Sequence, residues 1–132
     1  MTKVGIIEAG NVDQVLAKRH GNYSDMMLNW LNPFLKPKSS ISILIYKNEV
    51  LPKPTEADIW IITGSRHGVY ENLPWLKPLQ NFILKCHNQD IPMLGICFGH
   101  QIISEAMGGR VQKSEKGWGV GIQKYTITKA VP

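Results

Sequence analysis

Residues 92 to 109 of the 132-residue chain read PMLGICFGHQIISEAMGG, and this stretch decides the fold class. An apolar segment typical of a buried strand runs directly into Gly-x-Cys-x-Gly, and a helical pattern follows over 100–107. A strand that turns abruptly into a helix leaves its pivot residue strained and projecting, and the flanking glycines give such a turn room. We therefore expect Cys97 to stand at the start of a helix.

The position at a helix start has chemical consequences for Cys97. Unpaired backbone N–H groups and the positive end of the helix dipole favour a thiolate over a thiol. The same N–H groups can hold the oxyanion that forms when a thiolate attacks a carbonyl carbon. The pattern thus predicts a nucleophile, and the alternative is a small, buried and inert cysteine between a strand and a helix.

The rest of the chain alternates strand and helix patterns. Strands are expected over 3–7, 40–46, 59–63 and 92–96. Residues 9–22 are expected to be a loop with one helical turn, a helix is expected from Ser24 as N-cap to about Leu35, another from about Pro78 to Cys86, and a last one over 100–107. The glycine-containing segment 110–129 alternates in polarity, which predicts a β-hairpin or strand pair.

Charge and hydropathy exclude several classes of protein. The net charge is +5, but the fifteen Lys and Arg residues are scattered without a run, so we expect no nucleic-acid partner. No apolar stretch approaches the roughly 20 residues that a membrane span needs, and Glu8 comes too early for a secretory signal. A cytoplasmic protein without a membrane partner is the expectation.

The two cysteines, Cys86 and Cys97, are expected to be reduced thiols. The four histidines and two cysteines form no short pair with the usual zinc-ligand spacing, so we expect neither a metal site nor a cofactor.

The segment GICFGHQ, preceded by IITGS and followed by ISEAMGGRV, closely resembles the class I (triad-type) glutamine amidotransferases, particularly stand-alone domains related to the amidotransferase part of GMP synthase. It is also similar to plant-type γ-glutamyl peptidases. The resemblance implies that residues 1–132 are the N-terminal portion of one such domain, carrying the nucleophile elbow. It implies a three-layer, flavodoxin-like α/β fold with a mainly parallel sheet and a ligand site at the carboxyl ends of the third and fourth strands.

The resemblance also implies residue roles. Cys97 matches the nucleophile that attacks the side-chain amide of glutamine or of a γ-glutamyl small molecule, leaving a thioester. Phe98 matches the residue whose backbone N–H forms half of the oxyanion hole. The other half comes from a Gly-Gly-Pro type loop that here begins Thr63-Gly64-Ser65. Because Ser65 replaces the usual second glycine, the donor is the N–H of either Ser65 or Gly64.

Two further parts of the substrate site follow from the resemblance. Gln101, one turn along the helix from Cys97, is expected to contact the amino-acid end of the substrate. Gly117 and Trp118 resemble the segment lining the far side of the pocket, although a bulge in a hairpin explains glycines there equally well.

One catalytic part is missing from the sequence. The family supplies its base and carboxylate from a His-x-Glu motif downstream of the cysteine, and residues 1–132 contain no His-x-Glu. His100 belongs to the elbow pattern, and a loop histidine such as His67 is usually just solvated. We therefore expect the C-terminal part of the domain to be missing from this chain and the chain alone to be inactive.

Two function classes stay open. The first is a cysteine-dependent hydrolase of glutamine or γ-glutamyl amides, and the second is a binding module that keeps the pocket but lacks the base. The loss of later strands would expose a sheet edge, and a homodimer is one arrangement that would cover it.

Overall fold

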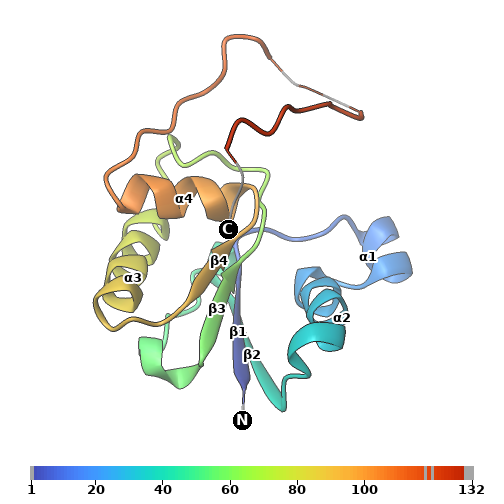
Figure 1. Ribbon diagram of the computed structural model, residues 1–132, viewed down its shortest axis with the longest axis vertical. Helices are drawn as coiled ribbons and strands as arrows, with labels where there is room; N and C mark the ends of the chain where they lie inside the picture. The colour runs from blue at the N-terminus through green and yellow to red at the C-terminus, as the bar shows by residue number, and fades with distance from the viewer. Residues whose placement is uncertain (1, 118, 120, 130–132) are drawn as a thin grey trace.

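Four parallel strands form the sheet on which the site is built (Figure 1). The structure is a computed structural model, and it describes residues 2–117, 119 and 121–129. The strands are β1 (Lys3–Glu8), β2 (Ser39–Leu44), β3 (Ile59–Ile62) and β4 (Met93–Gly95), in the spatial order β2-β1-β3-β4. Every neighbouring pair is parallel, so all four carboxyl ends lie at one edge of the sheet.

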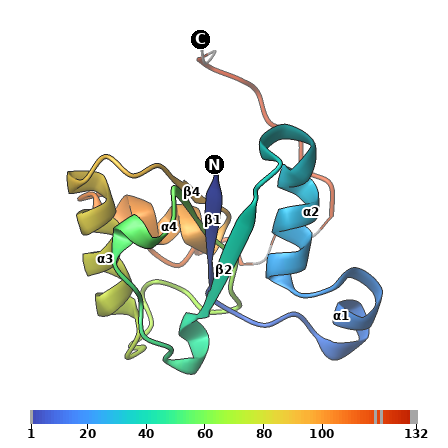
Figure 2. The ribbon, with the colours of Figure 1, turned by 90° about the horizontal axis from the view of Figure 1, so that it is seen from below.

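Helices cover both faces of this sheet (Figure 2). They are α1 (Gln14–His20), α2 (Tyr23–Leu35), α3 (Leu76–Asn88) and α4 (Phe98–Ala106), with two short 3₁₀ turns at Ile45–Lys47 and Pro54–Glu56. The α2 helix packs on one face, and α3 and α4 pack on the other. The predicted three-layer α/β fold with a parallel sheet is confirmed. Among the described residues, no helix has the length and apolar character that crossing a membrane requires.

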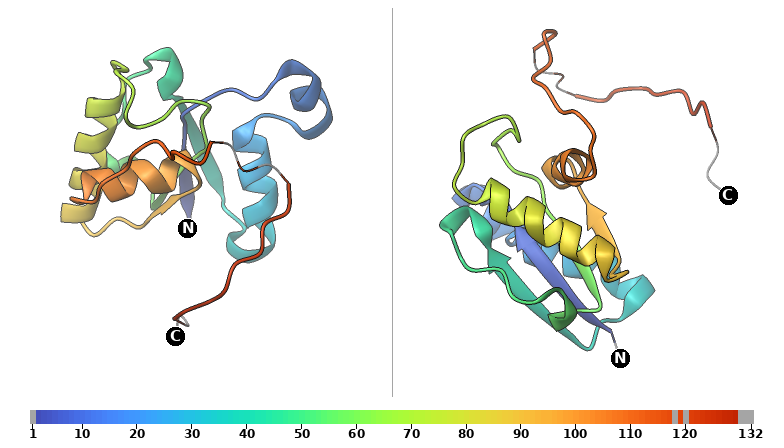
Figure 3. Two further views of the ribbon diagram at one scale, coloured as in Figure 1. Left: turned by 90° about the horizontal axis from the view of Figure 1, so that it is seen from above. Right: turned by 90° about the vertical axis from the view of Figure 1, so that its left-hand side faces the viewer.

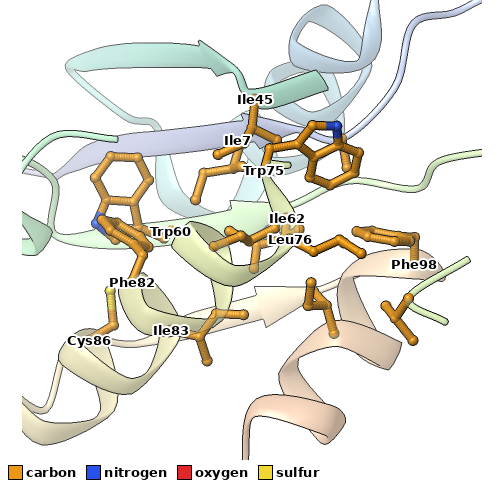
Figure 4. Packing of buried hydrophobic residues seen from close by; sticks show 14 of the residues in the cluster. Ile7, Ile45, Trp60, Ile62, Trp75, Leu76, Phe82, Ile83, Cys86 and Phe98 are labelled. Carbon is orange, nitrogen blue, oxygen red and sulfur yellow. The ribbon is translucent and has the colours of Figure 1, made fainter. Parts of the chain in front are cut away.

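The larger part of the core lies between the sheet and α3 (Figure 4). The ring of Trp60 meets that of Phe82 edge-on, with centroids 5.0 Å apart, and the indole N–H donates to the carbonyl of Pro54. Gly5 lies opposite Trp60 in the parallel register, and a Cβ there would run into the indole. The sheet therefore accommodates this large side chain only because β1 offers a glycine at that point.

The start of α2 differs from its prediction. Asn22, not Ser24, is the N-cap: its side chain accepts from the N–H of Asp25, and the Asp25 carboxylate accepts from the N–H of Asn22. This reciprocal capping box satisfies two backbone donors at once, which a serine cap two residues later could not do. Ser24 is instead buried, and its hydroxyl donates to the carboxylate of Glu8.

The boundaries of the other helices also differ from their predictions. The α3 helix begins at Leu76 rather than near Pro78, because Pro78 falls in the first turn, where its missing N–H costs no hydrogen bond. The α4 helix begins at Phe98, directly after Cys97 and two residues earlier than predicted. The helical turn expected in 9–22 is the seven-residue α1, capped by the Asp13 side chain.

The predicted hairpin in 110–129 is wrong for the part of it that the structure describes. Residues 110–117, 119 and 121–129 include no strand, and the segment leaves the end of α4 and runs away from the sheet (Figure 3). Val111 packs against the core, but farther along the segment Ile122, Tyr125 and Ile127 are exposed. Alternating polarity stabilises a strand only when a neighbouring surface covers the apolar side, and the described residues provide none here.

Glu8 is a buried carboxyl group at the end of β1. Burial raises the pKa of Glu8 from its ordinary 4.5, and the negative charge of Asp25 adds to the rise, while hydrogen bonds from Ser24 and Ser42 oppose it. The folded state therefore holds this proton more tightly than the unfolded chain does. The stability that results is present at low pH and is lost as the pH rises through the raised pKa.

We accordingly expect the free energy of unfolding of the wild type to fall, relative to that of Glu8→Gln, as the pH rises from 4.5 through neutrality. The amide keeps a hydrogen-bonding group beside Ser24 but cannot ionise. Urea unfolding at several pH values measures the difference. The exposed Glu56→Gln is the matched control, and a pH-independent difference for Glu8→Gln would contradict the assignment.

Candidate functional site

The thiol of Cys97 stands at the junction of β4 and α4. Cys97 has φ 56° and ψ −107°, a conformation that costs a non-glycine residue on the order of 1–3 kcal/mol. The residue is exposed and its thiol is free. The alternative of a buried, inert cysteine is therefore wrong, and the strained, projecting pivot expected from the Gly-x-Cys-x-Gly pattern is present.

The two glycines that flank this turn are required by the backbone around them. A Cβ on Gly95 would collide with the main chain of Gly99 and His100, and a Cβ on Gly99 would collide with the carbonyl of Ile62 in β3. The turn is held against β3 by a hydrogen bond of 3.0 Å from the N–H of Ile96 to that same carbonyl. The strand-to-helix turn is thus too tight for any side chain at either glycine.

Three backbone N–H groups near Cys97 have no hydrogen-bond partner among the described residues. In residues 2–117, 119 and 121–129, no acceptor takes a hydrogen bond from the backbone N–H of Phe98, of Gly64 or of Ser65. A Cβ built on Gly64 would lie 3.7 Å from the Cβ of Cys97, so the end of β3 lies directly beside the elbow. This arrangement offers N–H groups from two segments to an oxygen atom bound near the sulfur.

The loop that follows Ser65 folds on itself. The Ser65 hydroxyl accepts from the N–H of His67, and the imidazole Nδ1 of His67 lies 3.2 Å from a carboxylate oxygen of Glu71. The N–H of Gly68 also donates to Glu71, and it contributes more than His67 to holding the pKa of that carboxyl below its ordinary value. His67 is therefore engaged inside its own loop.

Aromatic contacts join this loop to the elbow. The imidazole of His67 meets the indole of Trp75 edge-on with centroids 6.2 Å apart, and the indole packs on the ring of Phe98 at 5.6 Å. Phe98 is 1% exposed, and its ring lies in the core, which fixes the first residue of α4 (Figure 4). The two segments that carry the free N–H groups are thereby held together.

The remaining predicted residues lie at different distances from the thiol. Gln101 is half-buried on α4, and its N–H donates to the carbonyl of Cys97 at 3.1 Å, one turn along. Gly117 has φ 75°, and a Cβ there would meet no atom within 4 Å, so the described residues do not pack against it. Trp118 lies outside the described residues. His100 is exposed on α4.

A groove on the described surface lies away from Cys97. It has a volume of about 690 Å³ and runs between segment 45–54 and α3, and none of Cys97, Gly64 or Gln101 lines it. Within the described ranges, no three His, Cys, Asp or Glu side chains gather closely enough to hold a metal ion.

Thr63 is a part of the site that sequence reasoning assigned no role. It is 1% exposed at the end of β3, and its hydroxyl accepts from the N–H of Ala9 and donates to the carbonyl of Gly64. The only signal in the sequence was a hydroxyl residue closing an apolar strand just before a glycine.

The two thiols should differ strongly in reactivity. Cys86 is fully buried on α3, and desolvation raises its pKa from 9.0 to about 11, which lowers its thiolate fraction at neutral pH roughly a hundredfold. We expect iodoacetamide near pH 7.5 to label Cys97 long before Cys86, as read by peptide mass spectrometry. Cys97→Ser should remain unlabelled until urea exposes Cys86. Labelling of Cys86 first in the folded protein would contradict the structure.

Comparisons with known proteins identify the family of the chain. The family model "Glutamine amidotransferase class-I" matches residues 39–128. The chain is 36% identical over 81 residues to gamma-glutamyl peptidase 4 of Arabidopsis thaliana, covering 58% of this chain and 32% of that protein. It is 43% identical over 56 residues to the glutamine-hydrolyzing GMP synthase of Treponema denticola, covering 42% of this chain and 10% of that protein.

A solved structure shares the fold. A glutamine amido transferase from Methylobacillus flagellatus superposes with a TM-score of 0.65 at 23% identity, covering 87% of this chain and 42% of that one. The chain thus spans a third or less of the two curated relatives above and under half of the solved structure.

Proposed function

Because the chain belongs to the class I glutamine amidotransferase family, we propose that Cys97 is its nucleophile and acts on the side-chain amide of glutamine or of a γ-glutamyl compound. The sulfur would bond to the amide carbon, the C–N bond would break, and the nitrogen would leave with a proton as ammonia or an amine. Water would then release glutamate from the thioester. The observation that carries this proposal is the exposed Cys97 at positive φ, beside unpaired backbone donors.

The oxyanion would be held from two sides. The N–H of Phe98 is one proposed donor, and the N–H of Ser65 or Gly64 is the other. Each such donor typically contributes about 10²- to 10³-fold to the rate. Their positions on the N-terminus of α4 and on the end of β3 support the proposal, because the Cβ position of Gly64 lies 3.7 Å from that of Cys97.

The amino-acid end of the substrate would lie along α4. We assign Gln101 to this contact because it follows Cys97 by one helical turn and is only half-buried. Gly117 and Trp118 are proposed for the far side of the same pocket, on the family resemblance.

The proposal assigns the general base to no histidine of residues 1–132. Among the described residues, neither His67, whose Nδ1 faces Glu71, nor His100, which is exposed on α4, makes a hydrogen bond to Cys97. This favours a second candidate function for the chain by itself, a module that binds and captures substrate without turnover. A His-x-Glu motif in the reading frame past Pro132 would support the hydrolase, and a stop codon there would support the binding module.

We also propose a cellular location and an oligomeric state for the protein. Both cysteines are free thiols, which supports a cytoplasmic location. Within the described residues β4 pairs only with β3, and its Leu94 is 37% exposed, which supports a homodimer formed across that edge. Light scattering of the wild type and of Leu94→Lys measures the mass, and a monomeric wild type would contradict the dimer.

Covalent labelling tests the substrate class. The glutamine analogue 6-diazo-5-oxonorleucine should label Cys97 faster than a diazoketone of equal chain length without the α-amino and α-carboxyl groups, because contacts to those groups hold the electrophile near the sulfur. Free glutamine should slow the labelling. Gln101→Ala should weaken that protection, whereas the exposed Gln112→Ala should not. Equal labelling by both reagents in a folded sample, without protection by glutamine, would overturn the proposal.

A further inference from the structure

We propose that the hydroxyl of Thr63 is the positioning group of the Cys97 site, locking the peptide group between Gly64 and Ser65 to the end of β1. The inference rests on the proposed function and extends it to a residue that contacts no substrate. Of the two candidates for the second oxyanion donor, Ser65 and Gly64, the inference favours the N–H of Ser65.

The contacts of Thr63 join two strands and the loop. Its hydroxyl accepts from the N–H of Ala9 at 3.0 Å and donates to the carbonyl of Gly64 at 3.1 Å, so both of its capacities are used. Its own N–H donates to the carbonyl of Ile7 at 3.0 Å. Since Thr63 is 1% exposed, water does not compete for these bonds.

Because the peptide group is planar, the hydrogen bond from Thr63 to the Gly64 carbonyl also fixes the orientation of the Ser65 N–H. The carbonyl of Gly64 and the N–H of Ser65 belong to one planar trans peptide group, so they point in opposite directions. A hydroxyl that holds the carbonyl therefore also fixes the direction of the N–H. Among the described residues, no N–H or O–H group donates to the carbonyl of Thr63, so the peptide group that carries the N–H of Gly64 is not held from its oxygen side.

Gly10, which follows β1, lies close to the same peptide group on its other side. A Cβ on Gly10 would lie 3.2 Å from the Cα of Ser65 and 3.4 Å from its hydroxyl oxygen, which is tighter than ordinary packing. Glycine at position 10 thus lets the chain leaving β1 approach Ser65 closely. The loop is restrained by the hydroxyl of Thr63 on one side and by the backbone of Gly10 on the other.

The chemical consequence concerns negative charge on the substrate. When the sulfur attacks a carbonyl carbon, charge develops on the carbonyl oxygen, and only a donor already aimed at that oxygen stabilises it without reorganisation. A peptide group free to rotate would lose most of this contribution. Alkylation by iodoacetamide displaces iodide and develops its charge on the leaving group, so it needs no such donor.

Amide NMR of the labelled protein tests the positioning itself. Thr63→Val keeps the side-chain shape but removes the hydroxyl, and it should shift or broaden the amide signals of Gly64 and Ser65. Thr63→Ser restores the hydroxyl and should restore the signals, and the exposed Thr126→Val should leave them unchanged. Wild-type signals for Gly64 and Ser65 in a folded Thr63→Val protein would overturn the inference.

Acylation kinetics test the consequence for chemistry. The probe is the 4-nitrophenyl γ-ester of glutamate, whose leaving group departs as 4-nitrophenolate without needing a proton, while the sulfur retains the γ-glutamyl group as a thioester. After subtraction of a Cys97→Ala blank, Thr63→Val should lower the acylation rate at least about tenfold, and Thr63→Ser should recover it. The rate of iodoacetamide alkylation at Cys97 should stay unchanged in both variants.

The NMR and kinetic experiments together distinguish failure of the positioning role from failure of the proposed function. A parallel fall of acylation and alkylation in Thr63→Val would mean general damage and would overturn the positioning role. If the wild type shows no acylation above the Cys97→Ala blank, the proposed function fails, and the NMR arm alone then decides whether Thr63 orients the loop.

Discussion

Replacing Gly99 with valine is expected to abolish the native fold. A Cβ at position 99 would occupy the place of the Ile62 carbonyl, which is main chain in the central part of the sheet and cannot rotate away. Overpacking a core costs roughly 1–3 kcal/mol when side chains can yield, and more when only backbone is available to move. Small domains are stable by only about 5–15 kcal/mol. We expect the cost of displacing the main chain of β3, together with that of placing the two methyl groups of valine, to exceed this free energy of unfolding.

Thermal unfolding followed by circular dichroism measures this effect, with Gly99→Ala as an intermediate case. Gly119→Val is the matched control, since among the described residues a Cβ at Gly119 would meet only the side-chain nitrogen of Gln123, at 3.9 Å. The control should melt like the wild type. A cooperative transition for Gly99→Val near the wild-type midpoint would show that the β4–α4 turn is not as tight as described.

Release of ammonia from glutamine by residues 1–132 is expected to stay at the level of the Cys97→Ala variant. Ammonia leaves only if its nitrogen is protonated as the C–N bond breaks, and general acid catalysis of this kind contributes about 10²- to 10⁴-fold. None of the four histidines makes a hydrogen bond to Cys97: the hydrogen bond of the His67 ring is to Glu71, and His20, His87 and His100 are exposed.

The same sample should nevertheless form the thioester with the 4-nitrophenyl ester, because that leaving group needs no proton. The two substrates together separate a missing acid from a missing nucleophile. Ammonia release clearly above the Cys97→Ala level would show that a base is present, and His100→Ala and His67→Ala would then identify it.

The parts of the fold that sequence could predict are those set by neighbouring residues. Gly95 and Gly99 limit the backbone around Cys97 within five positions, so the turn and its projecting thiol follow from local sterics alone. The four strands were likewise found from short apolar runs bounded by turn residues. Their order in the sheet was not predicted, because none of these runs specifies which strand lies beside it.

The parts that were missed depend on contacts between distant residues or on competing local motifs. The hydroxyl of Thr63 acquires its role only when Ala9, 54 residues earlier, lies beside it. The cap of α2 was misplaced because Asn22 and Asp25 together outcompete Ser24, whose hydroxyl is used by Glu8. The described residues of segment 110–129 form no strand, because their pattern specifies a side to be covered but not the surface that covers it.

The sheet order has a consequence for how the protein is made. The apolar β1 is synthesised first, yet it is completed on its second side only by β3, whose paired residues lie 55 positions later in the chain. At about 5–20 residues per second on the ribosome, β1 waits roughly 3–11 seconds for that partner. Such long-range parallel pairing is also slow to form. Until β3 arrives, one edge of the apolar β1 has no partner even when β2 is in place, and unpaired edges of this kind favour the aggregation of nascent chains that chaperones counter.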